Sequence, residues 1–221
     1  MIKFGFVFLL FLGGSALFGW ARGGAGDEPD DGSGPAQNQR LTALNGLVLY
    51  VLLVAIAATV LDITKLLPEH YVVGFVLIPP LVLKFSSTGY RLFRYYTRSA
   101  PYLLIGAPPL ILRLVVAPIL VVATVTVFAT GLELWLFGLR FGSVWIFAHT
   151  LSAVVMMFAV SAHLVAHMGR SAQLLTDEVA ARTPTGLLSR QSLIVAGLAA
   201  GAVLAVASLL YASPFSASVG G

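Results

Sequence analysis

Long apolar runs separated by short polar stretches occupy most of the chain. Six of these runs approach or exceed the roughly 20 residues that a membrane-spanning helix needs. They lie at about 1–21, 41–61, 70–90, 110–131, 145–167 and 193–211. The pattern predicts an all-α, polytopic integral membrane bundle of about six spans, with a core of four helices in residues 41–168.

The fifth run, Trp145–His167, is long enough to cross a bilayer, yet it contains His149, His163 and His167. At about 100° per residue, all three positions fall on one stripe of a helix. A rise of about 1.5 Å per residue places His149 and His163 roughly 21 Å apart along the axis. Ionisable groups inside a membrane are costly, so three imidazoles on one face indicate a function. We interpret the stripe as a site of haem ligation.

The N-terminal run, the polar stretches and the last span each have a predicted role. Residues 1–21 fit either a cleaved signal peptide or a retained first span. Arg22–Arg40 is rich in Gly, Pro, Asp and Gln and is predicted to be a disordered linker. Residues 169–190 are predicted to form a cytoplasmic loop, followed by a last span and tail in residues 191–221. Pro79-Pro80 is predicted to kink the third span, because proline lacks the N–H that a helix needs.

Lysine and arginine residues predict the orientation, because cytoplasmic loops carry an excess of both. If the linker is cytoplasmic, that side collects Arg22, Arg40, Arg91, Arg94, Arg98, Arg113, Arg170, Arg182 and Arg190. The other side then has only Lys3, Lys65 and Arg140. The opposite orientation would reverse this split of nine to three. The bias therefore favours a first segment that is retained as a span and runs from outside to inside.

Composition excludes several classes of protein. Hydrophobic residues make up 58% of the chain and charged residues 10%, as is typical of helical membrane proteins. The chain has no cysteine, which excludes disulfides, thiolate metal sites, iron–sulfur clusters and c-type haem attachment. The net charge of +4 is spread over loops and gives no reason to expect nucleic acid. Asp62, Glu69 and Glu133 lie at the ends of predicted spans and not inside them, and no enzyme motif stands out.

His70 begins the third predicted span and His149 begins the fifth, so both are expected at the same depth near the outer side. Two such imidazoles can clamp one metal between the helices, and bis-imidazole ligation favours electron transfer over oxygen chemistry. Gly74 lies one turn after His70 on the same face, where a small residue leaves room for a porphyrin. The alternative is that His70 is an ordinary interfacial residue beside Glu69.

A second haem is considered at His163. Its partner on the third span, 14 residues after His70, would be Lys84. Lysine ligates iron only when deprotonated, and it more often reaches the headgroups or pairs with a propionate. Otherwise His163 and His167 would hydrogen-bond polar groups of the bundle, such as Ser161, Ser86 or Thr88. A zinc site at His163 and His167 would lack the adjacent glutamate of zinc hydrolases.

Several stretches carry a resemblance, among them RLTALNGLVLYVLL, AHTLSAVVMMFAVSAHLVAH and the run PP-x-x-LK-x-x-STG-[YW]-R-x-x-RYY at Pro79–Tyr96. Over about residues 40–170 the chain resembles a family of small actinobacterial predicted membrane proteins. That family is similar in pattern to four-helix b-type cytochromes of membrane oxidoreductases. The resemblance implies that His70 and His149 are axial ligands. Lys84 departs from it, because a two-haem cytochrome normally has a second histidine there.

The expected function is that of a b-type cytochrome subunit with one haem b, or two, in the lipid bilayer of the plasma membrane. It would pass electrons between a quinone or an extracytoplasmic redox partner and another protein, as an electron-transfer subunit rather than a catalytic one. The alternative is a cofactor-free accessory or scaffold subunit of a larger membrane complex, with Gly197 and Gly201 as a docking face. The same glycine pair fits ordinary helix packing within the chain.

Overall fold

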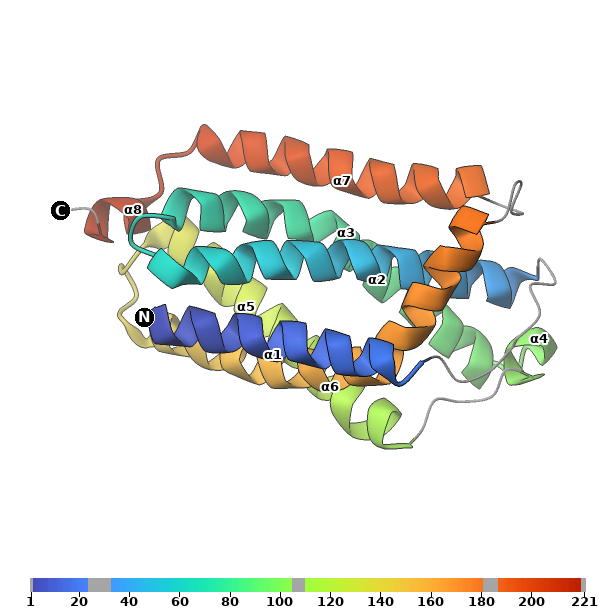
Figure 1. Ribbon diagram of the computed structural model, residues 1–221. Coiled ribbons are helices and arrows are strands. Elements are labelled where there is room, and N and C mark those ends of the chain that lie inside the picture. The colour runs from blue at the N-terminus through green and yellow to red at the C-terminus, as the bar shows by residue number, and fades with distance from the viewer. Residues whose placement is uncertain (1, 24–32, 105–109, 181–186, 220–221) are drawn as a thin grey trace.

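The computed structural model describes residues 2–23, 33–104, 110–180 and 187–219 (Figure 1). This part of the chain is almost entirely helical and contains no strand. Six helices in it are long and apolar enough to cross a membrane. They are α1 (Ile2–Ala21), α2 (Gly34–Thr59), α3 (Leu67–Tyr96), α5 (Ala117–Phe137), α6 (Val144–Ala180) and α7 (Leu187–Leu209). The prediction of an all-α, polytopic helical bundle is confirmed, and the apolar helices indicate a multi-pass membrane protein.

Shorter elements connect these helices: the 3₁₀ turn η1 (Val60–Asp62), α4 (Ala100–Leu104), the π-helical η2 (Leu112–Val116) and α8 (Pro214–Val219). Pro118 explains the π-helical turn, since its ring lacks an N–H and crowds the preceding turn. The N–H of Ala117 donates to Leu112 O, one residue further back than in an α-helix. The fourth predicted span therefore begins with a widened turn, and it continues past Gly131 to Phe137.

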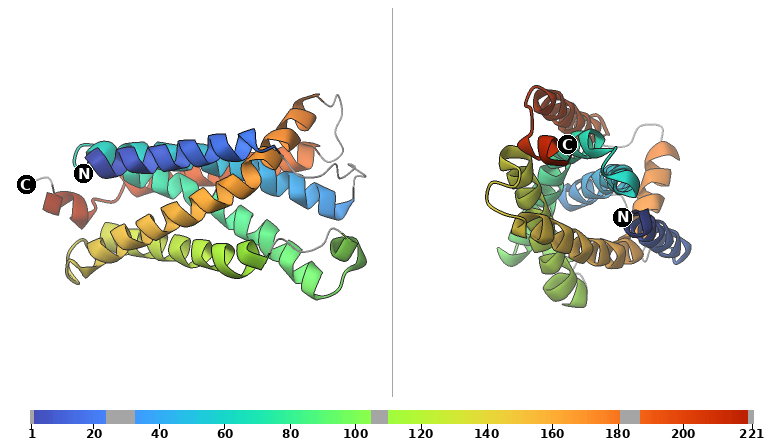
Figure 2. Two further views of the ribbon diagram at one scale, coloured as in Figure 1. Left: turned by 60° about the horizontal axis from the view of Figure 1, so that its bottom comes forward. Right: turned by 90° about the vertical axis from the view of Figure 1, so that its left-hand side faces the viewer.

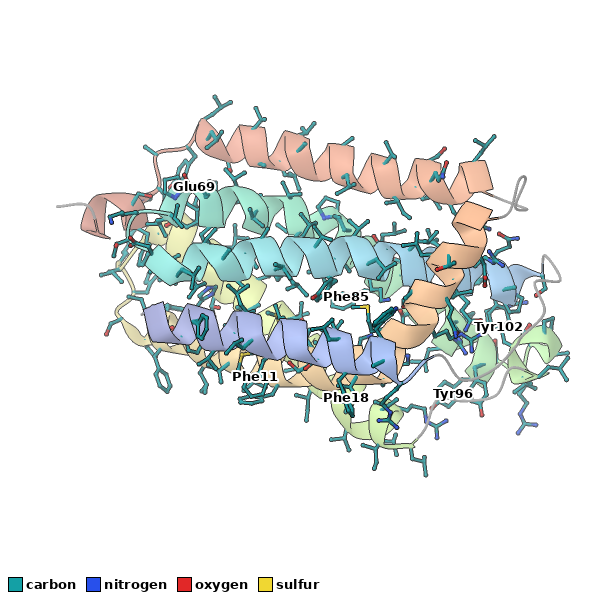
Figure 3. All side chains as sticks on the ribbon, viewed as in Figure 1. Phe11, Phe18, Glu69, Phe85, Tyr96 and Tyr102 are labelled. Atoms are coloured by element: carbon teal, nitrogen blue, oxygen red, sulfur yellow. The ribbon has the colours of Figure 1, made fainter. Side chains whose placement is uncertain are left out.

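Successive spans run in opposite directions, which gives the bundle two distinct ends (Figure 1). One end, called here the His70 end, holds the starts of α3 and α6 together with α8. The other, called the Arg91 end, holds α4 and the start of α7. Figure 3 shows Glu69 at the first end and Tyr96 and Tyr102 at the second. The alternation of the spans thus puts His70 and His149 at one end, as the sequence predicts.

The main apolar core includes α1. Its buried residues come from α1, α2, α5 and α6, and include Phe8, Leu12, Ala57, Val127, Met157 and Val160. The backbones of α1 and α6 approach closely at Gly19, where an added Cβ would lie only 2.5 Å from Leu164 O. The main apolar core therefore draws on α1, which was not among the four helices expected from the sequence.

Helix α7 packs on the outer side of α3 (Figure 2), near the proline pair. α3 stays helical through Pro79 and Pro80, and Pro80 has no N–H to donate to the carbonyl of Val76. A Cβ added at Gly201 would lie 2.5 Å from Val76 O, and one at Gly197 would lie 3.9 Å from Pro80 N. The glycine pair is thus used for packing inside the chain, which was one of its two interpretations.

Two segments predicted to be irregular are partly helical. α2 begins at Gly34, where Ser33 Oγ accepts a hydrogen bond from Ala36 N–H and Pro35 occupies the first turn. α6 continues to Ala180 through much of the predicted loop, which contains good helix formers. The predictions are therefore wrong for residues 34–40 and 169–180. Residues 24–32 and 181–186 of the same segments lie outside the described part of the chain.

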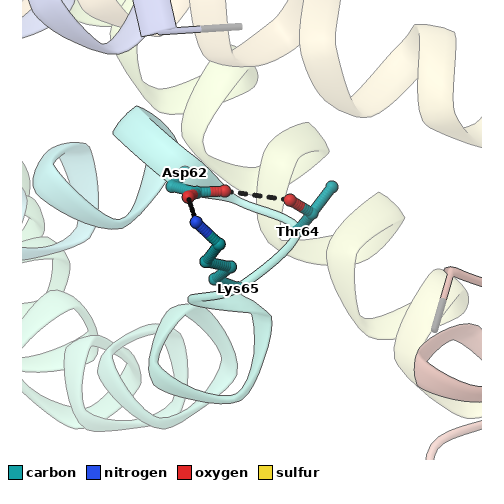
Figure 4. Close-up of polar contacts among 3 residues, drawn as sticks. All are labelled: Asp62, Thr64 and Lys65. Carbon is teal, nitrogen blue, oxygen red and sulfur yellow. Dashed lines mark hydrogen bonds and ion pairs between the residues drawn. The ribbon is translucent and has the colours of Figure 1, made fainter.

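The turn between α2 and α3 is organised by Asp62. Its carboxylate accepts a hydrogen bond from Thr64 Oγ1 at 2.9 Å and pairs with Lys65 Nζ at 3.0 Å (Figure 4). The ion pair is exposed and contributes little to global stability. Backbone N–H groups of Lys65 and Leu66 also donate to Asp62 O. These bonds fix the direction in which the chain enters α3 and reaches His70.

Candidate functional site

The rings of His70 and His149 lie close together at the His70 end. Their centres are 6.3 Å apart and their planes are inclined by 78°. His70 lies in the first turn of α3 and His149 in the second turn of α6. Both side chains are half-buried. The structure therefore brings together the two histidines that the sequence analysis placed at one depth.

The Nδ1 atom of His149 faces two oxygens of α5. It lies 3.0 Å from Val127 O and 3.2 Å from Thr130 Oγ1. A carbonyl oxygen can only accept, so Nδ1 must carry the hydrogen. The hydroxyl of Thr130 donates its own hydrogen to Thr126 O at 2.7 Å, so its oxygen is also an acceptor. It follows that the lone pair of His149 is on Nε2.

The Nδ1 atom of His70 is held in the same way by α2. It lies 2.7 Å from Oγ1 of Thr59, a buried residue at the end of that helix. The Thr59 hydroxyl donates its single hydrogen to Ile56 O at 2.6 Å. Thr59 therefore accepts from His70 Nδ1, and the lone pair of His70 is also on Nε2. Both histidines have the same tautomer, fixed by neighbouring helices that contain no histidine.

A glycine of α5 makes room for the His149 ring. A Cβ added at Gly131 would lie 3.0 Å from His149 Cε1 and 3.4 Å from its Nδ1, so a side chain would press on the imidazole. The sequence analysis expected Gly74 to provide space beside the pair. A Cβ at Gly74 would instead meet Ile56 Cδ1 of α2, at 3.9 Å. Gly131 is thus the small residue in contact with the pair.

Sequence reasoning missed Thr59, Thr130 and Gly131. A hydroxyl group in an apolar span needs hydrogen-bond partners. Each threonine hydroxyl donates to a carbonyl of its own helix and accepts from the Nδ1–H of a histidine. The adjacent pair Thr130-Gly131 in an otherwise apolar run was the available signal. The sequence alone does not show that this pair contacts His149, because that contact depends on how α5 packs against α6.

Three residues of the predicted lower site also come together. The ring centres of His163 and His167 are 4.5 Å apart, and the charge of Lys84 interacts with both residues. Lys84 Nζ donates a hydrogen bond to Thr42 O of α2 at 2.7 Å. A Cβ added at Gly46 would lie 3.0 Å from Lys84 Nζ, so glycine leaves room for the ammonium group. Lys84 is therefore bonded to the backbone inside the bundle.

A polar layer between α2 and α3 surrounds Lys84. Asn38 Nδ2 donates to Ser87 O at 3.0 Å, and the hydroxyls of Thr42 and Ser87 lie 3.0 Å apart. Ser161 does not belong to this network. Its Oγ is buried and has no hydrogen-bond partner among the described residues, so the expected hydrogen bond between Ser161 and His163 or His167 is not formed.

Within the described ranges, no group of three or more His, Cys, Asp or Glu side chains could hold a metal ion. A metal bound at the upper pair would therefore take only two ligands, His70 and His149, from these residue types. No known family, curated protein or solved structure matches this chain.

Proposed function

We propose that the chain is a membrane b-type cytochrome subunit, in which His70 and His149 ligate the iron of one haem b. The observation that carries this proposal is the shared tautomer of the two imidazoles. Histidines that ligate metals usually donate their other ring N–H to an oxygen acceptor, which orients the ring and frees Nε2. The bonds of His70 to Thr59 and of His149 to Val127 have this form.

The spacing of the rings is also compatible with one metal between them. Two imidazoles bound on opposite sides of a metal, with bonds of about 2.0 Å, have ring centres roughly 6 Å apart. The observed separation is 6.3 Å. Two side chains leave the coordination of a bare ion incomplete, whereas a porphyrin supplies four further nitrogens. Haem with two axial imidazoles provides one-electron transfer and has no open position for oxygen.

The residues around the pair have separate tasks in this proposal. Thr59 and Thr130 keep the hydrogens on Nδ1 and hold the ring orientations. Gly131 leaves space beside the His149 ring. The redox partner would be a quinone or a protein on the extracytoplasmic side of the cell membrane. The alternative function, a cofactor-free scaffold subunit, loses its main feature because Gly197 and Gly201 already pack on α3.

The proposal does not extend to a second haem at His163. Its expected partner, Lys84, donates to Thr42 O. Lys84 would have to give up this bond and lose its proton before its nitrogen could ligate iron. His163 is therefore not proposed as an iron ligand and becomes the matched control in the experiment.

The experiment is a visible spectrum of the protein purified from haem-supplied cells, oxidised and then reduced with dithionite. We expect a Soret band that shifts on reduction. His70→Ala and His149→Ala should each abolish it, because each removes one of two ligands to the same iron. His163→Ala should leave the spectrum unchanged.

Two results would contradict this function. One is a wild-type protein with no Soret band, and the other is a band that survives in both His70→Ala and His149→Ala. Either result would favour the scaffold function. A second, separable redox transition that disappears in His163→Ala would instead restore the two-haem interpretation.

A further inference from the structure

At the His70 end, the start of α3 and the ends of α5 and α7 meet near α8 (Figure 1). Residues of these segments line a small pocket. Its volume is about 120 Å³. It is lined by aromatic rings and hydroxyl groups, among them those of Tyr71, Trp135, Ser208, Tyr211, Ser213 and Ser216. None of the described residues that line it is charged. A pocket of this kind favours a neutral ligand, because it offers no counter-ion.

The pocket has a fixed aromatic wall. The ring of Trp135 lies 4.6 Å from that of Tyr211 and 4.9 Å from that of Phe75, centre to centre. Tyr211 Oη donates to Leu136 O and Ser213 Oγ donates to Trp135 O, each at 2.8 Å. These two bonds tie the segment after α7 to the end of α5. The pocket is therefore built into the packing of the helices.

Its polar groups provide both donors and acceptors. The hydroxyls of Ser208 and Ser213 give their hydrogens to backbone carbonyls, at 2.7 and 2.8 Å, so their oxygens remain acceptors. Tyr71 Oη is buried close to the hydroxyls of Ser213 and Ser216, and among the described residues none of its contacts has the geometry of a full hydrogen bond. A buried hydroxyl without a partner is costly. A ligand oxygen placed there would satisfy it.

The size of the pocket restricts the ligand further. A protein cavity of about 150 Å³ binds a benzene ring. The volume of about 120 Å³, with one side open, therefore suits one aromatic ring and is far too small for a porphyrin. Such a ring can pack against Trp135 and Tyr211 while an oxygen on it bonds to Tyr71.

We propose that this pocket binds the headgroup of a membrane quinol or quinone. The ligand is neutral, contains one flat ring and presents oxygens that can donate or accept. Tyr71 directly follows His70 in α3, so the pocket lies at the same end of the bundle as the histidine pair. The choice of a redox-active ring rests on the function proposed above, whereas the pocket and its hydroxyl groups do not.

The test measures binding through Trp135 in the full-length chain. Trp20 and Trp145 are replaced by Phe, which leaves Trp135 as the single reporter, because the chain has 3 tryptophans. His149→Ala is added so that no haem quenches the fluorescence. A decyl-substituted benzoquinone, and separately its quinol, should quench Trp135 saturably.

Three further variants locate the site. Tyr71→Phe keeps the ring and removes the hydroxyl, and it should weaken binding about tenfold. Ser208→Leu fills the pocket and should abolish binding. Tyr96→Phe, at the Arg91 end, is the matched control and should bind like the parent protein. Thermal unfolding of each variant checks that it is folded.

Quenching that is linear in quinone, or saturable but equal in all three variants, would overturn the proposal. Equal affinity for a simple alkylphenol would overturn the assignment to quinones. The two proposals of this article fail separately. A Soret band without saturable quenching contradicts the quinone site alone, and saturable quenching without a Soret band contradicts the haem site alone.

Discussion

His70 Nδ1 lies 2.7 Å from Oγ1 of Thr59, at the end of the neighbouring helix α2. The Thr59 hydroxyl has already donated its hydrogen to Ile56 O, so the imidazole is the donor in this pair. Val127 and Thr130 of α5 do the same for His149. Two helices without histidines thus decide which ring nitrogens are free to bind a metal.

Thr59→Val should weaken haem retention about 10- to 100-fold, because it removes the acceptor that orients His70. Thr130→Val should have a smaller effect, since Val127 O still accepts from His149. The measurement is the rate of haem transfer to a scavenging protein. Thr126→Val is the control, because among the described residues the Thr126 hydroxyl bonds within α5 alone, to Val122 O. Equal haem loss from Thr59→Val and Thr126→Val would show that the hydrogen bond to His70 has no such role.

Gly201→Ala should destabilise the protein, whereas Gly197→Ala should not. The new Cβ at Gly201 would lie 2.5 Å from Val76 O, and overpacking of this kind typically costs about 1–3 kcal/mol. The new Cβ at Gly197 would make ordinary contact, 3.9 Å from Pro80 N. Thermal unfolding in detergent measures the difference, and we expect a lower Tm for Gly201→Ala alone. Similar unfolding of the two variants would contradict the close approach of α7 to α3.

The peptide from Phe4 to Trp20 should be present in protein purified from membranes. Leu12 is fully buried in the main core, and α1 meets α6 backbone to backbone at Gly19. Removal of α1 would expose the apolar residues of α6 that it covers. Mass spectrometry of the purified chain tests this prediction. A mature N-terminus near Arg22 would show that the segment is a cleaved signal.

Ser143→Cys should react with an impermeant thiol reagent in intact cells, whereas Thr97→Cys should react only after permeabilisation. Both side chains are exposed, Ser143 at the His70 end and Thr97 at the Arg91 end. The chain has no native cysteine, so each variant carries a single reporter. The expected pattern follows from the excess of arginine at the Arg91 end. The reverse pattern would put the His70 end in the cytoplasm.

The number and order of the spans were available from the sequence alone. An apolar run long enough to cross a bilayer is a local property, so it can be recognised without knowing its neighbours. Because successive spans alternate in direction, the sequence also placed His70 and His149 at one end of the bundle. It misjudged the helix ends at Gly34 and Ala180, because hydropathy marks the apolar part of a helix and not the last hydrogen bond.

Only the tertiary structure decided which side chains meet. Periodicity gives the direction of a side chain around its own helix, but not the rotation of one helix against another. The contacts of Thr59 with His70 and of Gly131 with His149 depend on that rotation. The same holds for Lys84, which the sequence paired with His163 and which bonds to Thr42 O. Each of these contacts joins residues of two different helices, so packing between helices, and not local sequence, determines the chemistry at the site.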